Sequence, residues 1–171
     1  MYTLEKVKNE YRKVCCDAGA KSVLDVPIVL NGRLTRTLGR VIQEYDFSKD
    51  RYVSTKVEFS RQLIETATDK SIHDVIMHEA AHYIVTDRTG EVHGHDAVFK
   101  AVCAEIGTSN NQCATKVECT EEAKNLYKYS IYCPHCGKMV GGYSRMCKTI
   151  RNIEDYECKT CHGSLKVIQN W

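Results

Sequence analysis

The chain has 171 residues, of which 43% are hydrophobic and 27% charged, a balance typical of globular proteins. Its formal net charge of +2 is too small to indicate a partner by itself. No apolar run approaches the roughly 18–20 residues that cross a bilayer, which excludes a membrane-spanning helix. The start of the chain is polar and lacks the apolar core of a signal peptide. We therefore expect a cytoplasmic location, which includes association with the nucleoid, and no membrane partner.

The first third of the chain predicts one helix followed by a small sheet. Apolar residues recur at helical spacing over residues 3–18, and Gly19 is a suitable stop. Three β-rich runs follow at residues 26–30, 33–45 and 52–59. Asn31-Gly32 is a strong hairpin signal between the first two runs, and Gly39 is interpreted as a bulge in the second. These runs predict an antiparallel meander.

The middle of the chain predicts helices. Residues 60–66 suit a short helix, and Ser71 with Asp74 resembles a capping box that opens a longer, largely buried one. Residues 87–94 read as a loop and residues 96–106 as a further amphipathic helix that ends before Gly107. Residues 108–123 are polar and indicate a linker, helical in part near residues 121–126.

The longer helix carries the motif His78-Glu79-Ala80-Ala81-His82. Residues i and i+4 are neighbours on one helix face, so the two imidazoles can hold Zn²⁺ together. A third protein ligand and a water complete the tetrahedron of a catalytic zinc. Glu79 is then placed to take a proton from that water as general base.

The third ligand comes from His93 or His95, and we favour His95. It stands four residues before Phe99, on the apolar face of the next helix, whereas His93 lies on the loop side of Gly94. His73 is five residues from His78 and off the ligand face, so it is interpreted as a surface histidine. Tyr83 is interpreted as a core residue, and the spacing identifies no group that stabilises an oxyanion.

The C-terminal part predicts a second zinc site. Cys133-Pro134-His135-Cys136 and Cys158-Lys159-Thr160-Cys161 have the spacing of a zinc ribbon, in which four thiolates close one structural site. His135 and His162, next to the cysteines, are the alternative ligands. The remaining cysteines are interpreted as reduced, non-ligand thiols: Cys15, Cys16, Cys103, Cys113, Cys119 and Cys147.

Basic residues are concentrated in the same part. Residues 124–171 contain eight Lys and Arg against three Asp and Glu, a formal +5. This excess is a weak indication of nucleic-acid contact, because an exposed basic face is usually only solvated. The candidate phosphate contacts are Lys128, Lys138, Arg145, Lys148 and Arg151.

Four motifs in one order resemble the SprT-like family over most of the chain. They are the segment from Asn31-Gly32-Arg33 to Leu38-Gly39-Arg40, the HEAAH motif, Gly94-His95-Asp96-Ala97-Val98-Phe99-Lys100 and the ribbon cysteines. The resemblance implies a zinc-dependent metalloprotease domain with His78, His82 and His95 as ligands and Glu79 as the catalytic residue. The family includes Spartan, which degrades proteins crosslinked to DNA. Asp96 departs from the glycine that often follows the third histidine, but it suits a helix start.

We therefore expect an α+β fold in which a small antiparallel sheet packs on a central HExxH helix and its flanking helices, as in zincins, followed by a small β zinc ribbon. The expected domains are residues 1–123 and 124–171. The expected function is zinc-dependent peptide-bond hydrolysis through a Glu79-activated, zinc-bound water, with protein substrates that include DNA-bound or DNA-crosslinked proteins. The alternative is a nucleic-acid-associated zinc-binding module with a transcription-related role and little or no protease activity. The oligomeric state is left open.

Overall fold

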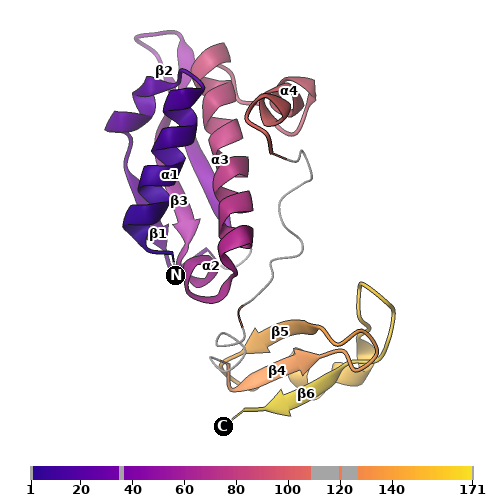
Figure 1. Ribbon diagram of the computed structural model, residues 1–171. Coiled ribbons are helices and arrows are strands. Elements are labelled where there is room, and N and C mark those ends of the chain that lie inside the picture. The colour runs from indigo at the N-terminus through magenta and orange to yellow at the C-terminus, as the bar shows by residue number, and fades with distance from the viewer. Residues whose placement is uncertain (1, 35–36, 109–119, 121–126, 171) are drawn as a thin grey trace. The chain divides into compact units, whose positions relative to one another are not determined.

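A computed structural model describes residues 2–34, 37–108, 120 and 127–170 of the chain (Figure 1). The chain forms two compact units, Met1–Glu118 and Cys119–Trp171. The predicted domain boundary at residues 123 and 124, and the helix expected near residues 121–126, lie outside the described residues. Within those residues, no helix combines the length and the apolarity needed to cross a membrane.

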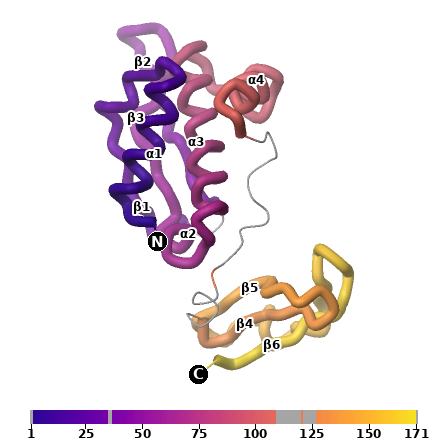
Figure 2. Tube along the Cα trace, viewed as in Figure 1, coloured from indigo at the N-terminus to yellow at the C-terminus, as the bar shows by residue number. Residues whose placement is uncertain are grey.

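The first unit combines helices with a three-stranded sheet, so the predicted α+β class is confirmed. Its elements in chain order are α1 (Leu4–Asp17), the 3-10 helix η1 (Lys21–Asp25), β1 (Ile28–Asn31), β2 (Gly39–Asp46), β3 (Arg51–Ser60), α2 (Arg61–Thr66), α3 (Asp69–Thr89) and α4 (Ala97–Glu105). Helices α1 and α3 lie side by side against the sheet (Figures 1 and 2).

Helix α1 forms where the apolar spacing predicted it. Thr3 accepts a hydrogen bond from the Lys6 amide at 3.2 Å, which satisfies one of the free amides of the first turn. The helix buries one stripe that includes Val7, Tyr11 and Cys15. Gly19 then adopts a positive φ of 87°, which a glycine reaches without a Cβ penalty and which ends the helix.

The sheet is mixed, and the predicted antiparallel meander is wrong in its first strand. The strand order is β1-β3-β2, with β1 parallel and β2 antiparallel to β3. Asn31 does not form a two-residue hairpin. Its side-chain oxygen accepts the Arg33 amide at 2.9 Å, which turns the chain into a longer connection to Gly39. This connection carries the chain past β3, so β1 and β2 end up on opposite sides of it.

Two further details of the predicted elements are corrected. The irregularity in the β2–β3 ladder lies between Ile42 and Gln43 rather than at Gly39. The cap of α3 is Thr68, whose hydroxyl accepts the Ser71 amide at 3.3 Å, so the helix begins before Ser71. A threonine and a serine separated by two residues can both start a helix, and tertiary packing selected the earlier one.

The same helix continues to Thr89, through residues expected to form a loop. Arg51 of β3 donates to the backbone carbonyl of Asp87 and to that of Thr86, which also accepts the Gly90 amide at 2.9 Å. Gly90 follows in the left-handed conformation with φ 73°, and its carbonyl accepts the Tyr52 amide at 2.8 Å. The turn end of the β2–β3 hairpin therefore holds the C-terminal end of α3.

The core of this unit lies between the sheet and α1 and α3. The Tyr11 ring packs edge-to-face on Phe59 of β3 and Tyr83 of α3, with ring centroids 5.8 Å and 6.2 Å apart. All three side chains are almost completely buried. Tyr83 is thus a core residue, as the sequence predicted.

The second unit is a small antiparallel sheet with four clustered cysteines, which agrees with the predicted ribbon. Its strands are β4 (Tyr129–Tyr132), β5 (Met139–Tyr143) and β6 (Lys166–Gln169), in the order β5-β4-β6, and it also contains α6 (Lys148–Arg151) and η2 (Ile153–Asp155). The ring of Tyr127 lies against Gly142 of β5, at a place where any Cβ would collide with it. A glycine in this strand is therefore required by close packing.

Glu58 predicts a specific dependence of stability on pH. It is buried on β3, where its carboxylate contacts Lys56 at 2.8 Å, Asn31 at 2.9 Å and Arg40 at 2.8 Å. The hydrogen bond from Lys56 and the one from Asn31 lower its pKa from 4.5 to about 2. The ionised form therefore stabilises the fold fully above pH 4.5, and this contribution is lost as the pH falls towards 2.

We expect the wild-type free energy of unfolding to fall more steeply than that of Glu58→Gln between pH 6 and pH 3.5. The difference should reach on the order of 1–2 kcal/mol. Urea unfolding of both proteins across this range measures it, and comparing the two cancels the titration of all other groups. Parallel pH profiles would contradict the assignment.

Candidate functional site

Helix α3 presents His78 and His82 on one face, one turn apart, with ring centroids separated by 4.9 Å. The helix is buried along most of its length, and His78 itself is 5% exposed. The Tyr11 hydroxyl donates to the backbone carbonyl of Glu79 at 3.1 Å. Helix α1 thereby fixes the position of α3 at the motif.

His95 brings a third imidazole to the same point. It lies just before Asp96, the cap of α4, and not within the first turn of that helix as the sequence suggested. Its Nε2 atom is 3.2 Å from Nε2 of His78 and 3.2 Å from Nε2 of His82. The rings of all three histidines contact Phe99 of α4, with centroids 4.3–5.2 Å from its ring.

This arrangement suits a metal ion. Three imidazole nitrogens around a tetrahedral zinc, each bonded at about 2.0 Å, lie about 3.3 Å apart. The burial of His78 and His82 and the charges of neighbouring imidazoles lower the pKa of both to about 4, so both are neutral near pH 7. Neutral rings whose protons sit on Nδ1 point only lone pairs at one another. A cation at their centre turns this repulsion into attraction.

Glu79 is buried beside these ligands, with 4% of its surface exposed. Burial raises the pKa of its carboxyl to about 8. A cation held by the neighbouring imidazoles would favour the ionised form and so lower that pKa. The carboxylate also packs against the start of β2. A Cβ added to Gly39 would lie 2.7 Å from Cγ of Glu79 and 3.1 Å from its Oε1.

The close approach of Gly39 to Glu79 was not found from the sequence. The sequence predicts a bulge at Gly39, whereas in the structure this glycine leaves room for the Glu79 carboxylate. A glycine inside a strand also signals close approach by another group, and that was the available clue.

The other two histidines of this unit lie outside the triad. His73 contacts Glu10 of α1, in keeping with its interpretation as a surface residue. His93 points its Nδ1 atom at Asp96, 2.8 Å away. The structure therefore brings His95 and not His93 to the other two ligands.

The second cluster consists of Cys133, Cys136, Cys158 and Cys161. The sulfur atoms of Cys133 and Cys161 are 3.5 Å apart, and those of Cys136 and Cys158 are 3.7 Å apart. Four thiolates bonded to zinc at about 2.3 Å lie about 3.8 Å apart, so this cluster could also hold a metal ion.

Local backbone geometry prepares this cluster. Backbone amides of Thr160 and Cys161 hydrogen-bond to Cys158 and lower the pKa of its thiol, whereas burial and the neighbouring cysteines raise the pKa of Cys161. Neither neighbouring histidine belongs to the four-cysteine group, and His162 hydrogen-bonds Glu157 at 2.8 Å.

Among the described residues, no other cysteine joins either cluster. Cys15, Cys16, Cys103 and Cys147 are free thiols in the described part of the chain. Cys113 and Cys119 lie outside that part.

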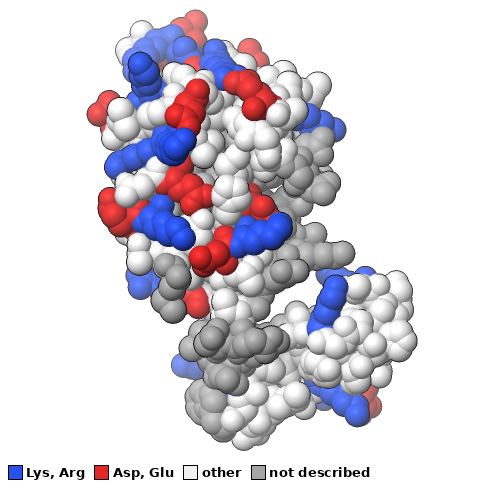
Figure 3. Space-filling model, viewed as in Figure 1, with Lys and Arg blue, Asp and Glu red and all other residues white. Residues whose placement is uncertain are grey.

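The five basic residues predicted to contact nucleic acid all belong to the second unit. Lys128 and Lys138 precede β4 and β5, Arg145 follows β5, and Lys148 and Arg151 belong to α6. All except Lys128 are exposed. On the visible face of this unit, Figure 3 shows more basic than acidic side chains, whereas both signs alternate over the first unit.

Comparison with known proteins places these features in a family. The SprT-like family matches residues 4–119, which include the three histidines and Glu79. A relative named Protein SprT-like from Staphylococcus epidermidis is 29% identical over 143 residues, which cover 83% of this chain and 82% of the relative. A relative of the same name from Oceanobacillus iheyensis is 30% identical, and the match covers 69% of this chain and 73% of the relative. Another, from Lactiplantibacillus plantarum, is 26% identical, and the match covers 81% of each chain.

The family match covers more than half of the chain, and the histidine triad has the geometry typical of zincin metallopeptidases. The chain belongs to the SprT-like family.

Proposed function

We propose that the protein is a zinc metallopeptidase that hydrolyses peptide bonds of protein substrates. The observation that carries the proposal is the meeting of three imidazole Nε2 atoms beside a buried carboxylate, on a helix with the HExxH spacing. His78, His82 and His95 would hold the zinc. The three-histidine set leaves a coordination position for water or substrate, as catalytic zinc sites do, whereas the four-cysteine set is closed and suits a structural zinc.

When bound, zinc supplies Lewis-acid polarisation of a carbonyl group and lowers the pKa of water to about 7. Glu79 performs the proton transfers. Its carboxylate accepts a proton from the attacking water and delivers it to the amine that leaves when the peptide bond breaks. Its burial and its contact with Gly39 hold the carboxylate in one place, which favours these transfers because a fixed base needs no reorganisation.

The direct test compares wild type with Glu79→Gln on unfolded casein and on a purified DNA-binding protein. Glutamine keeps the size of the side chain but cannot accept the proton, so we expect cleavage to fall about 10²–10⁴-fold. Zinc content should stay at two ions per chain in this variant, while His78→Ala with His82→Ala should retain only the ion of the cysteine cluster. Equal cleavage by wild type and Glu79→Gln would overturn the proposed mechanism.

Gly39→Ala should separate the placement of Glu79 from metal binding. The added Cβ displaces the Glu79 carboxylate, so we expect kcat to fall about 10–100-fold with zinc content and KM little changed. Gly32→Ala is the matched control, because the nearest group to its Cβ is the Arg61 side chain at 3.8 Å. If Gly39→Ala and Gly32→Ala have the same kcat, the contact with Glu79 does not matter for turnover.

We further propose that the second unit recruits the peptidase to DNA or DNA-bound protein through phosphate contacts from Lys128, Lys138, Arg145, Lys148 and Arg151. The formal excess of basic residues in this part of the chain and the exposure of four of these five side chains support the idea. Such contacts release counterions, so binding should weaken steeply as salt rises.

Lys148→Glu with Arg151→Glu should weaken binding to a labelled DNA oligonucleotide roughly tenfold at moderate salt and reduce the salt dependence. Fluorescence anisotropy measures both, with single- and double-stranded oligonucleotides as separate arms. The control is Lys13→Glu with Lys70→Glu, which makes the same change in net charge on exposed positions of α1 and α3. Equal weakening by both pairs would mean that only the total charge matters.

A further inference from the structure

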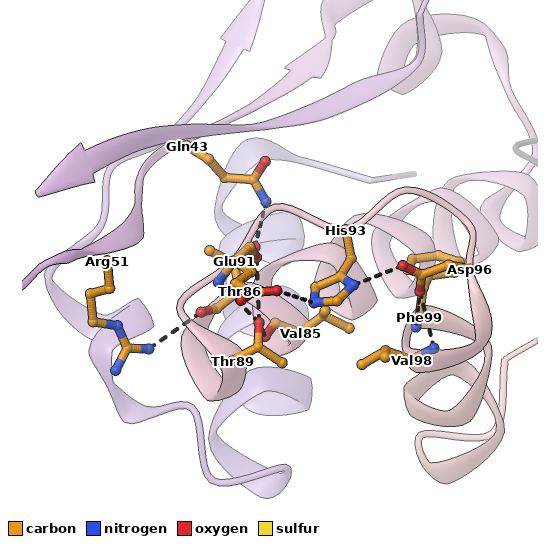
Figure 4. A network of polar contacts seen from close by, with 10 residues as sticks. All are labelled: Gln43, Arg51, Val85, Thr86, Thr89, Glu91, His93, Asp96, Val98 and Phe99. Atoms are coloured by element: carbon orange, nitrogen blue, oxygen red, sulfur yellow. Dashed lines mark hydrogen bonds and ion pairs between the residues drawn. The ribbon is translucent and has the colours of Figure 1, made fainter.

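His93 lies two residues before the ligand His95 but does not join the triad. Its side chain is only 15% exposed, although it stands in a loop between α3 and α4. Figure 4 shows its ring between Glu91 and Asp96, with Nδ1 2.8 Å from Asp96 Oδ2 and Nε2 3.8 Å from Glu91 Oε2. The ring therefore spans the loop that presents His95.

Asp96 connects this ring to the next helix. One of its carboxylate oxygens contacts His93, while the other accepts the backbone amides of Val98 at 3.0 Å and Phe99 at 3.1 Å. Those amides open α4, and the Phe99 ring packs on all three ligand rings. A single carboxylate thus joins His93 to the helix that lines the metal site.

The other end of the loop is anchored on α3. The Thr89 hydroxyl donates to the Val85 carbonyl at 2.9 Å and accepts the Glu91 amide at 3.1 Å. Between the two anchors lies Gly94, and no other group lies within 4 Å of the position that its Cβ would take. A glycine next to His95 adds backbone freedom, and ordering that segment when a metal binds costs conformational entropy.

We propose that His93 is a positioning residue of the metal site, which holds the loop so that His95 meets His78 and His82 before the metal arrives. The inference rests on the triad being the zinc site of the proposed peptidase. It assigns His93 no contact with the metal or with the substrate. Its contribution is to zinc affinity, because a site that is already ordered loses less conformational freedom on binding.

The test measures the zinc affinity of the triad in the full chain by competition with a chelator, with the cysteine cluster loaded. His93→Ala removes the contact with Asp96 and should weaken zinc binding at the triad about 10–100-fold. His93→Asn places a polar atom where Nδ1 lies and should restore the affinity to within about threefold of wild type. At saturating zinc, His93→Ala should recover most of the wild-type kcat, because the side chain takes no part in the reaction.

The matched control is His73→Ala, which removes another histidine–carboxylate contact, with Glu10, on the same unit but outside the site. It should leave zinc affinity unchanged. Asp96→Asn keeps a side-chain oxygen that can cap α4. Its effect should not add to that of His93→Ala, because the two residues act through one contact.

Wild-type zinc affinity in His93→Ala would overturn the inference and leave the proposed function standing. Equal loss in His93→Ala and His93→Asn would also overturn it, since the restored polar contact would then have no effect. Tight zinc binding by wild type without any cleavage would instead overturn the proposed function, and the affinity measurements would still decide the role of His93.

Discussion

The meeting of three imidazole nitrogens at one point is the constraint on which the first unit depends. His78, His82 and His95 hold their Nε2 atoms about as far apart as ligands of one zinc ion, with 3.2 Å on the two edges that join His95 to the others. Without a cation this arrangement sets lone pairs against one another inside a poorly solvated region. The fold offsets that cost elsewhere, by burying α3 along most of its length against α1, α4 and the sheet. The site is therefore ordered by packing, and a metal ion would find its ligands already in place.

The elements around α3 serve different parts of this site. Helix α1 fixes the backbone at Glu79 through the hydrogen bond from the Tyr11 hydroxyl. Strand β2 packs against the Glu79 side chain at Gly39. Arg51, next to the turn of the β2–β3 hairpin, holds two carbonyls at the end of α3, where the loop that carries His95 begins. The sheet thus contributes no histidine to the triad, yet it helps to determine where Glu79 and His95 lie.

The four-cysteine cluster suits stabilisation of the second unit rather than catalysis. The strands of the second unit are short, and the unit exposes several large apolar side chains: Val140, Met146, Tyr156 and Ile168. A unit of this size usually buries too little apolar surface to be stable without a cross-link, and a structural metal ion is one of the usual cross-links. The two knuckles bring four sulfur atoms together for such a metal. The two clusters therefore pair one open ligand set suited to chemistry with one closed set suited to stability.

Local sequence patterns were sufficient to predict the helix that carries His78 and His82, the cysteine knuckles and the α+β class. Helical periodicity and the spacing of metal ligands both depend on residues only a few positions apart. The choice of His95 over His93 also followed from spacing relative to Phe99. Tertiary structure alone decided that β1 pairs parallel to β3, that α3 starts at Thr68 and reaches Thr89, and that Gly39 meets Glu79. Each of these depends on contacts between residues far apart in the chain, whose partners no local pattern specifies. The sequence by itself therefore determined which atoms can bind a metal, while long-range packing decided how those atoms are held.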